Sequence, residues 1–209
     1  FPLTCHPSES PSLQMATSFS RPLHYSPFTI HFLIMPTQVI NDSEIYQRVT
    51  LEAVPQAQTF IWIATADIKD MYVKQGPRMI PFLQMLSNLI ETGVSIRIIH
   101  AKEPGPAFRK DFDRFPNLID GLEMILCPRT HFKTVIVDGK TAYTGSANLT
   151  GAGMGAKSEN RRNFESGIFS DDPEIIHPLM EQFDKLWIGG HCKPCQRKAY
   201  CVTYHELIG

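Results

Sequence analysis

The chain has 209 residues, enough for one domain of ordinary size with an appendage, and its 43% hydrophobic and 20% charged residues are typical of globular proteins rather than disordered or fibrous ones. No apolar run is long enough to cross a bilayer, and the longest, residues 28–35, contains His31. Twenty Lys and Arg against 21 Asp and Glu give a net charge of −1, so bulk charge does not argue for a nucleic-acid partner.

Residues 1–37 differ in composition from the rest of the chain. They hold several prolines and many serines but only two charged residues, Glu9 and Arg21. Because frequent proline interrupts hydrogen-bonded ladders, we expect an irregular tail outside the core. Two origins are open: an over-long reading frame whose product starts at Met35, which we favour, or a transit peptide, since the stretch is rich in Ser and poor in acids.

From residue 38 the apolar residues follow regular periods. Helical spacing predicts helices over residues 44–54, 79–91, 108–115 and 172–187, and apolar or β-branched runs predict strands over residues 59–65, 94–99, 122–126, 133–137, 141–144 and 164–169. In the last helix we expect Asp171 or Asp172 as the cap and Ile175, Leu179, Phe183 and Leu186 on one face. This order predicts an α/β fold, a mixed β-sheet flanked by helices, over residues 38–190.

The segment from residue 131 to 165 carries the groups suited to a reaction. In chain order these are His131, Lys133, Asp138, Ser146, Asn148 and Glu165. On a strand, residues 131 and 133 point to the same face, which places an imidazole beside an ammonium. The imidazole can attack phosphorus while Lys133 and the Asn148 amide bind the phosphoryl oxygens. A nucleophilic imidazole needs its other nitrogen held, and Glu165 is the candidate carboxylate.

The spacing His-x-Lys-x4-Asp-x6-Gly-Ser-x-Asn resembles the signature of the phospholipase D superfamily, although each residue taken singly fits an ordinary structural role. The resemblance extends over residues 55–190. It implies a phosphodiesterase, a hydrolase that forms a phosphohistidine at His131 without a catalytic metal or other cofactor. It further implies phosphate binding by Lys133 and Asn148, a supporting hydroxyl at Ser146, a structural Asp138 and a carboxylate, Glu165, that holds His131.

The motif occurs only once, which has a mechanistic consequence. Large members of the superfamily combine two copies in one active site, whereas small members are homodimers. A second acid must protonate the leaving oxygen when a single His131 attacks. We therefore predict an isologous homodimer in which two His131 side chains face each other.

A glycine-rich loop, residues 151–163, follows the motif and carries Lys157, Arg161 and Arg162. Its glycine spacing is a weak match to dinucleotide-binding loops. Two interpretations stay open: a flexible rim that binds a polyanionic substrate, or a solvated surface loop.

Four cysteines form a second group: Cys127, Cys192, Cys195 and Cys201, the last three in the tail 191–209. Without a secretion signal such a set favours a metal framework, either zinc or an iron–sulfur cluster, with His191 or His205 as substitute ligands. The C-x2-C-x5-C spacing after a distant cysteine is similar to the iron–sulfur staple of certain RecB-type nucleases. The alternative is free surface thiols.

Three functions remain open. The favoured one is a nucleic-acid phosphodiesterase, supported by chain size, the single motif and basic residues in the loop and tail. The others are a phospholipase or phosphatidyltransferase acting on phospholipids, and a nucleic-acid-binding module without turnover. We expect a cytoplasmic protein without a transmembrane segment.

Overall fold

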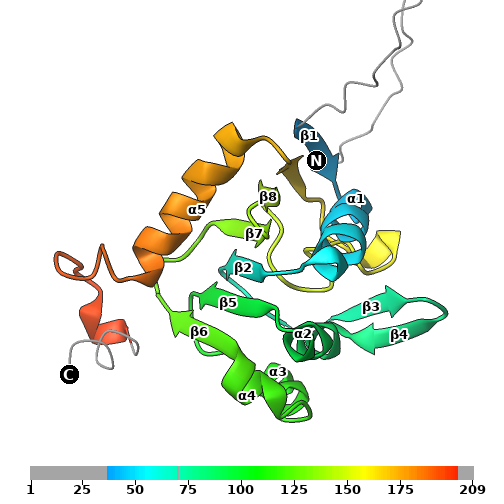
Figure 1. The fold of residues 1–209 in the computed structure, drawn as a ribbon, viewed down its shortest axis with the longest axis horizontal. Helices are drawn as coiled ribbons and strands as arrows, with labels where there is room; N and C mark the ends of the chain where they lie inside the picture. The colour runs from blue at the N-terminus through cyan, green and yellow to red at the C-terminus, as the bar shows by residue number, and fades with distance from the viewer. Residues whose placement is uncertain (1–36, 70, 202–209) are drawn as a thin grey trace, which may run out of the picture. The chain divides into compact units, whose positions relative to one another are not determined.

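The computed structural model describes residues 37–69 and 71–201, which form a mixed seven-stranded sheet and a separate two-stranded hairpin (Figure 1). The predicted N-terminal tail, residues 1–37, and the expected product start at Met35 lie outside the described residues, except for Thr37, which is the first residue of strand β1. No helix in the described part is long and apolar enough to cross a membrane.

The large sheet has the strand order β1-β9-β8-β7-β2-β5-β6. Its members are β1 Thr37–Asn41, β2 Phe60–Thr65, β5 Ser95–His100, β6 Leu122–Leu126, β7 Lys133–Val137, β8 Thr141–Gly145 and β9 Ser166–Ser170. Strands β2, β5 and β6 run parallel, and the β2–β7, β7–β8, β8–β9 and β9–β1 pairs are antiparallel. The hairpin pairs β3 Tyr72–Gln75 with β4 Arg78–Pro81.

The helical elements cover both faces of the large sheet (Figure 1). They are α1 Ser43–Ile45, the π-helical η1 Tyr46–Ala53, the 3-10 turn η2 Val54–Gln56, α2 Phe82–Glu91, α3 Pro106–Phe112, α4 Asn117–Gly121, the 3-10 turn η3 Glu159–Arg161, α5 Pro173–Trp187 and the 3-10 turn η4 Lys198–Tyr200. Val135 of β7 packs in the larger core with Leu83 and Leu86 of α2, while Ile136 packs with Ile176 of α5 on the opposite face.

The predicted fold class is confirmed, with three differences in detail. The expected helix over residues 79–91 begins only at Phe82, because residues 78–81 pair as strand β4 and Pro81 precedes the helix. In α5, Ile176 rather than Ile175 is buried. The predicted cap is confirmed at Asp172, which accepts from the Glu174 N–H at 2.9 Å. Strand β1, the hairpin and α4 were not predicted, since each is too short or too polar to show a period.

Candidate active site

Lys133 is the first residue of β7, and His131 lies two residues before it, outside the strand. The imidazole is exposed, whereas Lys133 is only 8% exposed. The Lys133 Nζ donates to the His131 carbonyl at 2.6 Å and lies 3.3 Å from the His131 Nδ1. The structure therefore brings together the imidazole and ammonium that the motif predicts, with the ammonium held in a largely buried position.

Asn148 is fixed from the neighbouring strand β2. Its Oδ1 accepts from the Ala66 N–H at 3.2 Å and the Asp67 N–H at 3.1 Å, directly after β2 ends. Antiparallel pairing of Ala64 with Thr134 places this end of β2 beside Lys133. Since the amide oxygen is occupied by backbone donors, the Asn148 Nδ2 is the group left to donate to a ligand.

Ser146 and Glu165 form a separate hydrogen-bonded unit. The Ser146 Oγ donates to the Glu165 carboxylate and accepts from the Ser166 N–H at 3.0 Å. The other carboxylate oxygen accepts from the Asn163 Nδ2 at 3.0 Å, and the Glu165 N–H donates to the Asp42 Oδ1 at 2.9 Å. Glu165 is thus anchored at its backbone and at both carboxylate oxygens.

The expected contact between Glu165 and His131 is not made in the described residues. The carboxylate is engaged by Ser146 and Asn163, and the neighbour of the His131 Nδ1 is Lys133. An ammonium can only donate, so this arrangement favours an imidazole with its proton on Nε2.

Asp138 lies at the other end of β7 and does not join the His131 group. Its carboxylate accepts from the backbone N–H groups of Gln58, Thr59 and Phe60 at 2.9, 2.8 and 2.9 Å. Burial raises the pKa of Asp138, but these donors outweigh it and the net pKa is lowered. The aspartate therefore ties the entry to β2 to the turn after β7, where its own φ is 54°.

Gly145 allows the turn that carries Ser146 and Asn148 to lie close to β9. A Cβ at this position would be 2.5 Å from both the Ser166 carbonyl oxygen and the Tyr143 hydroxyl. That hydroxyl accepts from the Ala147 N–H at 3.2 Å, and burial raises the pKa of Tyr143 to about 12. Backbone contact on both sides leaves no room for a side chain here.

The loop after the motif is closed by its own backbone. The Lys157 N–H donates to the Gly151 carbonyl at 3.1 Å, and the Asn163 N–H donates to the Ala152 carbonyl at 3.1 Å. The exposed Lys157 lines a groove with Lys69, Tyr72 and Met79, so cationic and apolar side chains share it. Arg161 belongs to η3 and Arg162 follows it, and neither lines this groove.

Sequence reasoning counted Arg197 among the basic residues of the C-terminal tail but did not place it, or Arg129, beside His131. The groove that contains His131 is also lined by Arg129 and by Arg197 from the C-terminal tail. The Arg197 Nη1 donates to the Pro128 carbonyl at 3.3 Å, which holds this arginine against the segment between β6 and β7. Arg197 is 66 positions beyond His131, so only tertiary structure brings them together.

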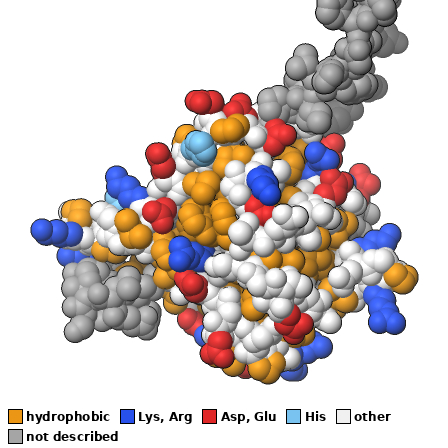
Figure 2. Space-filling model, in the orientation of Figure 1, with side chains coloured by type: hydrophobic (Ala, Val, Ile, Leu, Met, Phe, Trp, Pro, Cys, Tyr) orange, Lys and Arg blue, Asp and Glu red, His pale blue; other side chains and the backbone are white. Residues whose placement is uncertain are grey.

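Basic side chains also gather at two edges of the surface. Figure 2 shows Lys and Arg side chains over the C-terminal tail at the left and, at the right, beside hydrophobic side chains on hairpin β3–β4. In the hairpin, Tyr72 is 57% and Met79 is 55% exposed. On the face shown, basic side chains thus accompany both the C-terminal tail and the hairpin.

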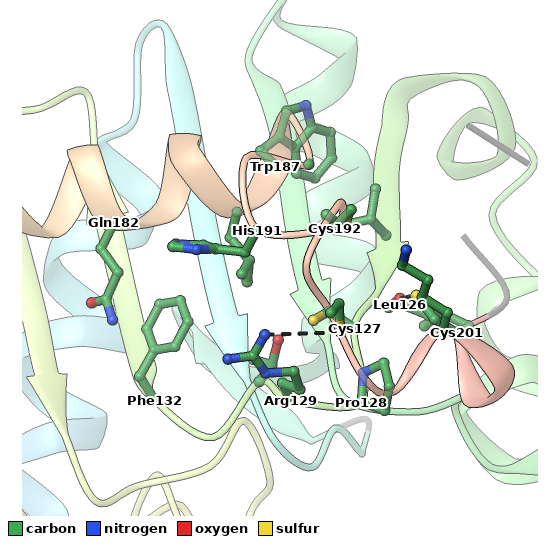
Figure 3. A pocket seen from close by; sticks show the side chains of 16 residues that line it. Leu126, Cys127, Pro128, Arg129, Phe132, Gln182, Trp187, His191, Cys192 and Cys201 are labelled. Atoms are coloured by element: carbon green, nitrogen blue, oxygen red, sulfur yellow. Dashed lines mark hydrogen bonds between the residues drawn. The ribbon is translucent and has the colours of Figure 1, made fainter. Parts of the chain in front are cut away.

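All four cysteines of the predicted metal site line one pocket (Figure 3). None is in a disulfide. Burial and the neighbouring thiols of Cys201, Cys127 and Cys195 raise the pKa of Cys192. Among the described residues, however, no group of three or more His, Cys, Asp or Glu side chains forms a preformed metal site, so the expected ligand set is not supported as it stands. His191 lines the same pocket, and His205 lies outside the described residues.

Three comparisons place this chain among known proteins. A family model described as "Cardiolipin synthase, PLD-like domain" matches residues 50–187. The mitochondrial cardiolipin hydrolase of Chlamydomonas reinhardtii is 31% identical over 96 residues, covering 46% of this chain and 40% of that protein. The mitochondrial cardiolipin hydrolase of Danio rerio is 34% identical over 65 residues, covering 31% and 26%. The matches thus span less than half the length of these relatives.

A solved structure shows the same fold. Nuc from Salmonella typhimurium, described as a phospholipase D family member, superposes with a TM-score of 0.52 at 23% sequence identity. The superposition covers 72% of this chain and 93% of Nuc. The mixed sheet and its flanking helices are therefore those of a known solved fold.

Proposed function

Because this chain belongs to the phospholipase D superfamily, we propose that it hydrolyses phosphodiester bonds by covalent catalysis at His131. The observation that carries the proposal is the placement of three groups at one edge of the sheet. An exposed imidazole, a largely buried ammonium and an amide whose oxygen is already occupied supply one candidate nucleophile and two candidate phosphate donors near the start of β7.

The reaction proceeds in two displacements at phosphorus. A ring nitrogen of His131 attacks, the bond from phosphorus to the leaving oxygen breaks, and that oxygen takes a proton from an acid. Water then attacks the phosphohistidine, giving its proton to a base, and the His131–phosphorus bond breaks. Lys133 and the Asn148 Nδ2 stabilise the negative charge on the phosphoryl oxygens in both steps. No metal ion takes part in either step.

Glu165 acts as a positioning residue in this mechanism. Attack by Nε2 requires a proton on Nδ1 and an acceptor to hold it, and Lys133 supplies no acceptor. We assign that role to the Glu165 carboxylate after the imidazole turns away from Lys133. Glu165→Gln is then expected to lower kcat more than it changes KM, and to alter the pH profile of kcat.

The acid that protonates the leaving oxygen comes from a second copy of the chain. His131 is exposed, so it is accessible to a partner across a two-fold axis. We propose an isologous dimer with two facing imidazoles. Sedimentation of wild-type protein should give a dimer, and a mixed dimer with one His131→Ala copy should be inactive. A fully active monomer would refute the dimer.

We propose a nucleic acid as the substrate class. Arg129 and Arg197 flank His131 in one groove, and Lys69 and Lys157 line another with Tyr72. Cations that follow a phosphate backbone, with an exposed ring available for base stacking, are typical of single-strand binding.

A phospholipid substrate is the second candidate, favoured by a specific observation. Both curated relatives are named cardiolipin hydrolases, and Phe164, next to Glu165 in the chain, is 92% exposed. An exposed aromatic beside a phosphodiester site suits insertion into a lipid surface. Since these relatives are named mitochondrial, the cytoplasmic location stays a prediction.

A substrate panel tests the proposal. Wild-type protein and His131→Ala are incubated briefly, in the presence of EDTA, with single-stranded DNA, double-stranded DNA, RNA and cardiolipin vesicles. We expect cleavage of single-stranded nucleic acid by wild type and none by the variant. Cleavage of cardiolipin alone would select the second candidate. Binding without cleavage would indicate a non-catalytic module, and cleavage by His131→Ala would refute covalent catalysis at this residue.

A further inference from the structure

We propose that Cys127, Cys192, Cys195 and Cys201 bind one thiophilic metal centre, a zinc ion or an iron–sulfur cluster, that fastens the C-terminal tail beside the active site. This assignment does not depend on the identity of the substrate. It rests on where the fold brings the four sulfurs, on how little else holds the tail, and on the contacts that the tail makes near His131.

The four cysteines come from two segments far apart in sequence. Cys127 directly follows β6, and the other three lie after α5. From here on, the tail means residues 188–201, the described residues that follow α5. All four line one pocket. The Cys201 Sγ donates to the Leu126 carbonyl at 3.5 Å. This contact brings Cys201 to the residue that precedes Cys127 in the chain.

The tail lacks the packing that usually orders a segment. No residue from 188 to 201 is buried, and Ile188 and Tyr200 are 70% and 78% exposed. Its backbone makes only short turns, such as Cys192 N–H to the Gly189 carbonyl and Cys195 N–H to the Cys192 carbonyl. Segments without a core of their own are commonly held by disulfides or metals, and none of these cysteines forms a disulfide.

The surroundings of Cys195 suit a thiolate. The Arg197 N–H donates to the Cys195 Sγ at 3.4 Å, and the Arg129 guanidinium donates to it at 3.8 Å. Hydrogen bonds from groups outside the ligand set orient a ligating sulfur, and these two donors hold the Cys195 Sγ toward the segment between β6 and β7. Four thiolates are the ligand set of structural zinc and of iron–sulfur clusters.

The described side chains do not form a preformed metal site, so binding must draw the sulfurs together. The required adjustment falls on an exposed segment of short turns rather than on a packed helix. Coupling of metal binding to local ordering is usual for small cysteine sites. The metal-bound tail should therefore be more ordered than the metal-depleted one.

The same contacts link the metal centre to the active site. Cys195 accepts from Arg129 and from Arg197, and both arginines line the groove that holds His131. Fixing Cys195 thus holds the Arg129 guanidinium and the Arg197 backbone beside the nucleophile. This part of the inference rests on the proposed function: loss of the metal should raise KM for an anionic substrate more than it lowers kcat.

Metal content gives the first test, independent of activity. Protein purified aerobically and anaerobically is analysed by elemental analysis and absorbance. We expect either about one zinc per chain and no colour, or about four irons with absorption near 400 nm in the anaerobic sample. Substoichiometric metal in both preparations, with Cys127, Cys192, Cys195 and Cys201 all reactive toward a thiol reagent in the native protein, would overturn the proposal.

Variants test the ligand assignment. Cys192→Ser with Cys195→Ser should lose the metal, whereas Cys5→Ser, a cysteine outside the described residues, should retain it. A measurement on wild-type protein covers the case in which the double variant fails to fold. A mercurial is added, and the metal released is measured against the number of thiols that have reacted. Full metal retention by the double variant would contradict the assignment.

Tryptic cleavage tests the ordering of the tail. Lys193, Arg197 and Lys198 lie in the tail and are trypsin sites. We expect cleavage at these sites to be at least tenfold faster after chelation. The rate of cleavage within residues 37–187 should change less. Equal rates with and without metal would refute the fastening role. If metal and protection are found but no substrate is cleaved, the proposed function fails and the metal site stands.

Discussion

Strand β7 and the C-terminal tail lie on either side of His131 and are held in opposite ways. Every residue of β7, Lys133–Val137, is buried between two helical layers. The tail, residues 188–201, contains no buried residue and contacts the sheet region through arginine and cysteine side chains. One side of the site is therefore fixed by the fold, and the other depends on a few polar contacts.

This difference separates the two tasks of the site. Chemistry needs groups placed within fractions of an ångström, and these come from the buried strand and its neighbours. Substrate capture tolerates more freedom, and its proposed cations, such as Arg197 of the tail and Lys157 of the loop after the motif, lie on exposed segments. Changes on the strand side should therefore affect kcat, and changes on the tail side should affect KM.

The largest effect is expected for Asn148→Ala. The variant removes a donor to the phosphoryl oxygens and also leaves the Ala66 and Asp67 N–H groups without their acceptor. We expect kcat to fall about 10²- to 10³-fold. Steady-state kinetics beside Asn160→Ala, an exposed asparagine in the neighbouring loop, measures it. An unchanged kcat would remove Asn148 from the phosphate site.

Gly145→Ala should disturb the strand side without changing any charge. Its Cβ would meet the Ser166 carbonyl oxygen and the Tyr143 hydroxyl at 2.5 Å, so β8 and β9 must separate. We expect a loss of about 2–3 kcal/mol in the free energy of unfolding, as for other overpacked positions. Urea denaturation measures it, and Gly105→Ala, with open space around its Cβ, is the matched control.

Asp138→Asn should lower stability while leaving the catalytic groups in place. The carboxylate accepts from three backbone N–H groups at the far end of β7. We expect a loss of about 2 kcal/mol at neutral pH by urea denaturation, with kcat little changed. A large fall in kcat at unchanged stability would give Asp138 a role in the reaction.

The same aspartate gives a pH dependence with a defined sign. Its folded pKa is lowered, so its contribution is complete above the unfolded value near 3.8 and is lost as the pH falls through the folded value. Wild type should therefore lose more stability than Asp138→Asn below about pH 4. Parallel unfolding curves across the acid range would contradict this.

The smallest effect is expected on the tail side. Arg197→Ala removes one exposed cation from the His131 groove. KM for an anionic substrate should rise about threefold to tenfold with kcat nearly constant, and the rise should shrink in high salt. Lys140→Ala, an exposed lysine near Asp138, is the control. A fall in kcat instead would place Arg197 among the catalytic groups.

Sequence predicted the strand side well because its signals are local. The apolar run of residues 133–137 and the fixed spacing of the motif identify β7, His131, Lys133 and Asn148 without reference to any other segment. The fold class followed from the order of such segments, and the sheet confirms it.

Long-range contacts explain what sequence missed. Arg197 reaches His131 only through the path of the tail, whereas Arg129 is two residues from His131 in the sequence. The β3–β4 hairpin contributes Tyr72 and Met79 through pairing of short, polar strands. The expected Glu165–His131 contact required side-chain orientations that spacing does not encode, and the carboxylate binds Ser146 and Asn163 instead.

The covalent intermediate is the most direct test of the account. Wild-type protein is mixed with the substrate selected by the panel, quenched in alkali within milliseconds to seconds, digested and analysed by mass spectrometry. The account predicts a phosphoryl adduct on His131 that forms and decays at rates compatible with turnover. Turnover without an adduct at His131, or with an adduct on another residue, would contradict it.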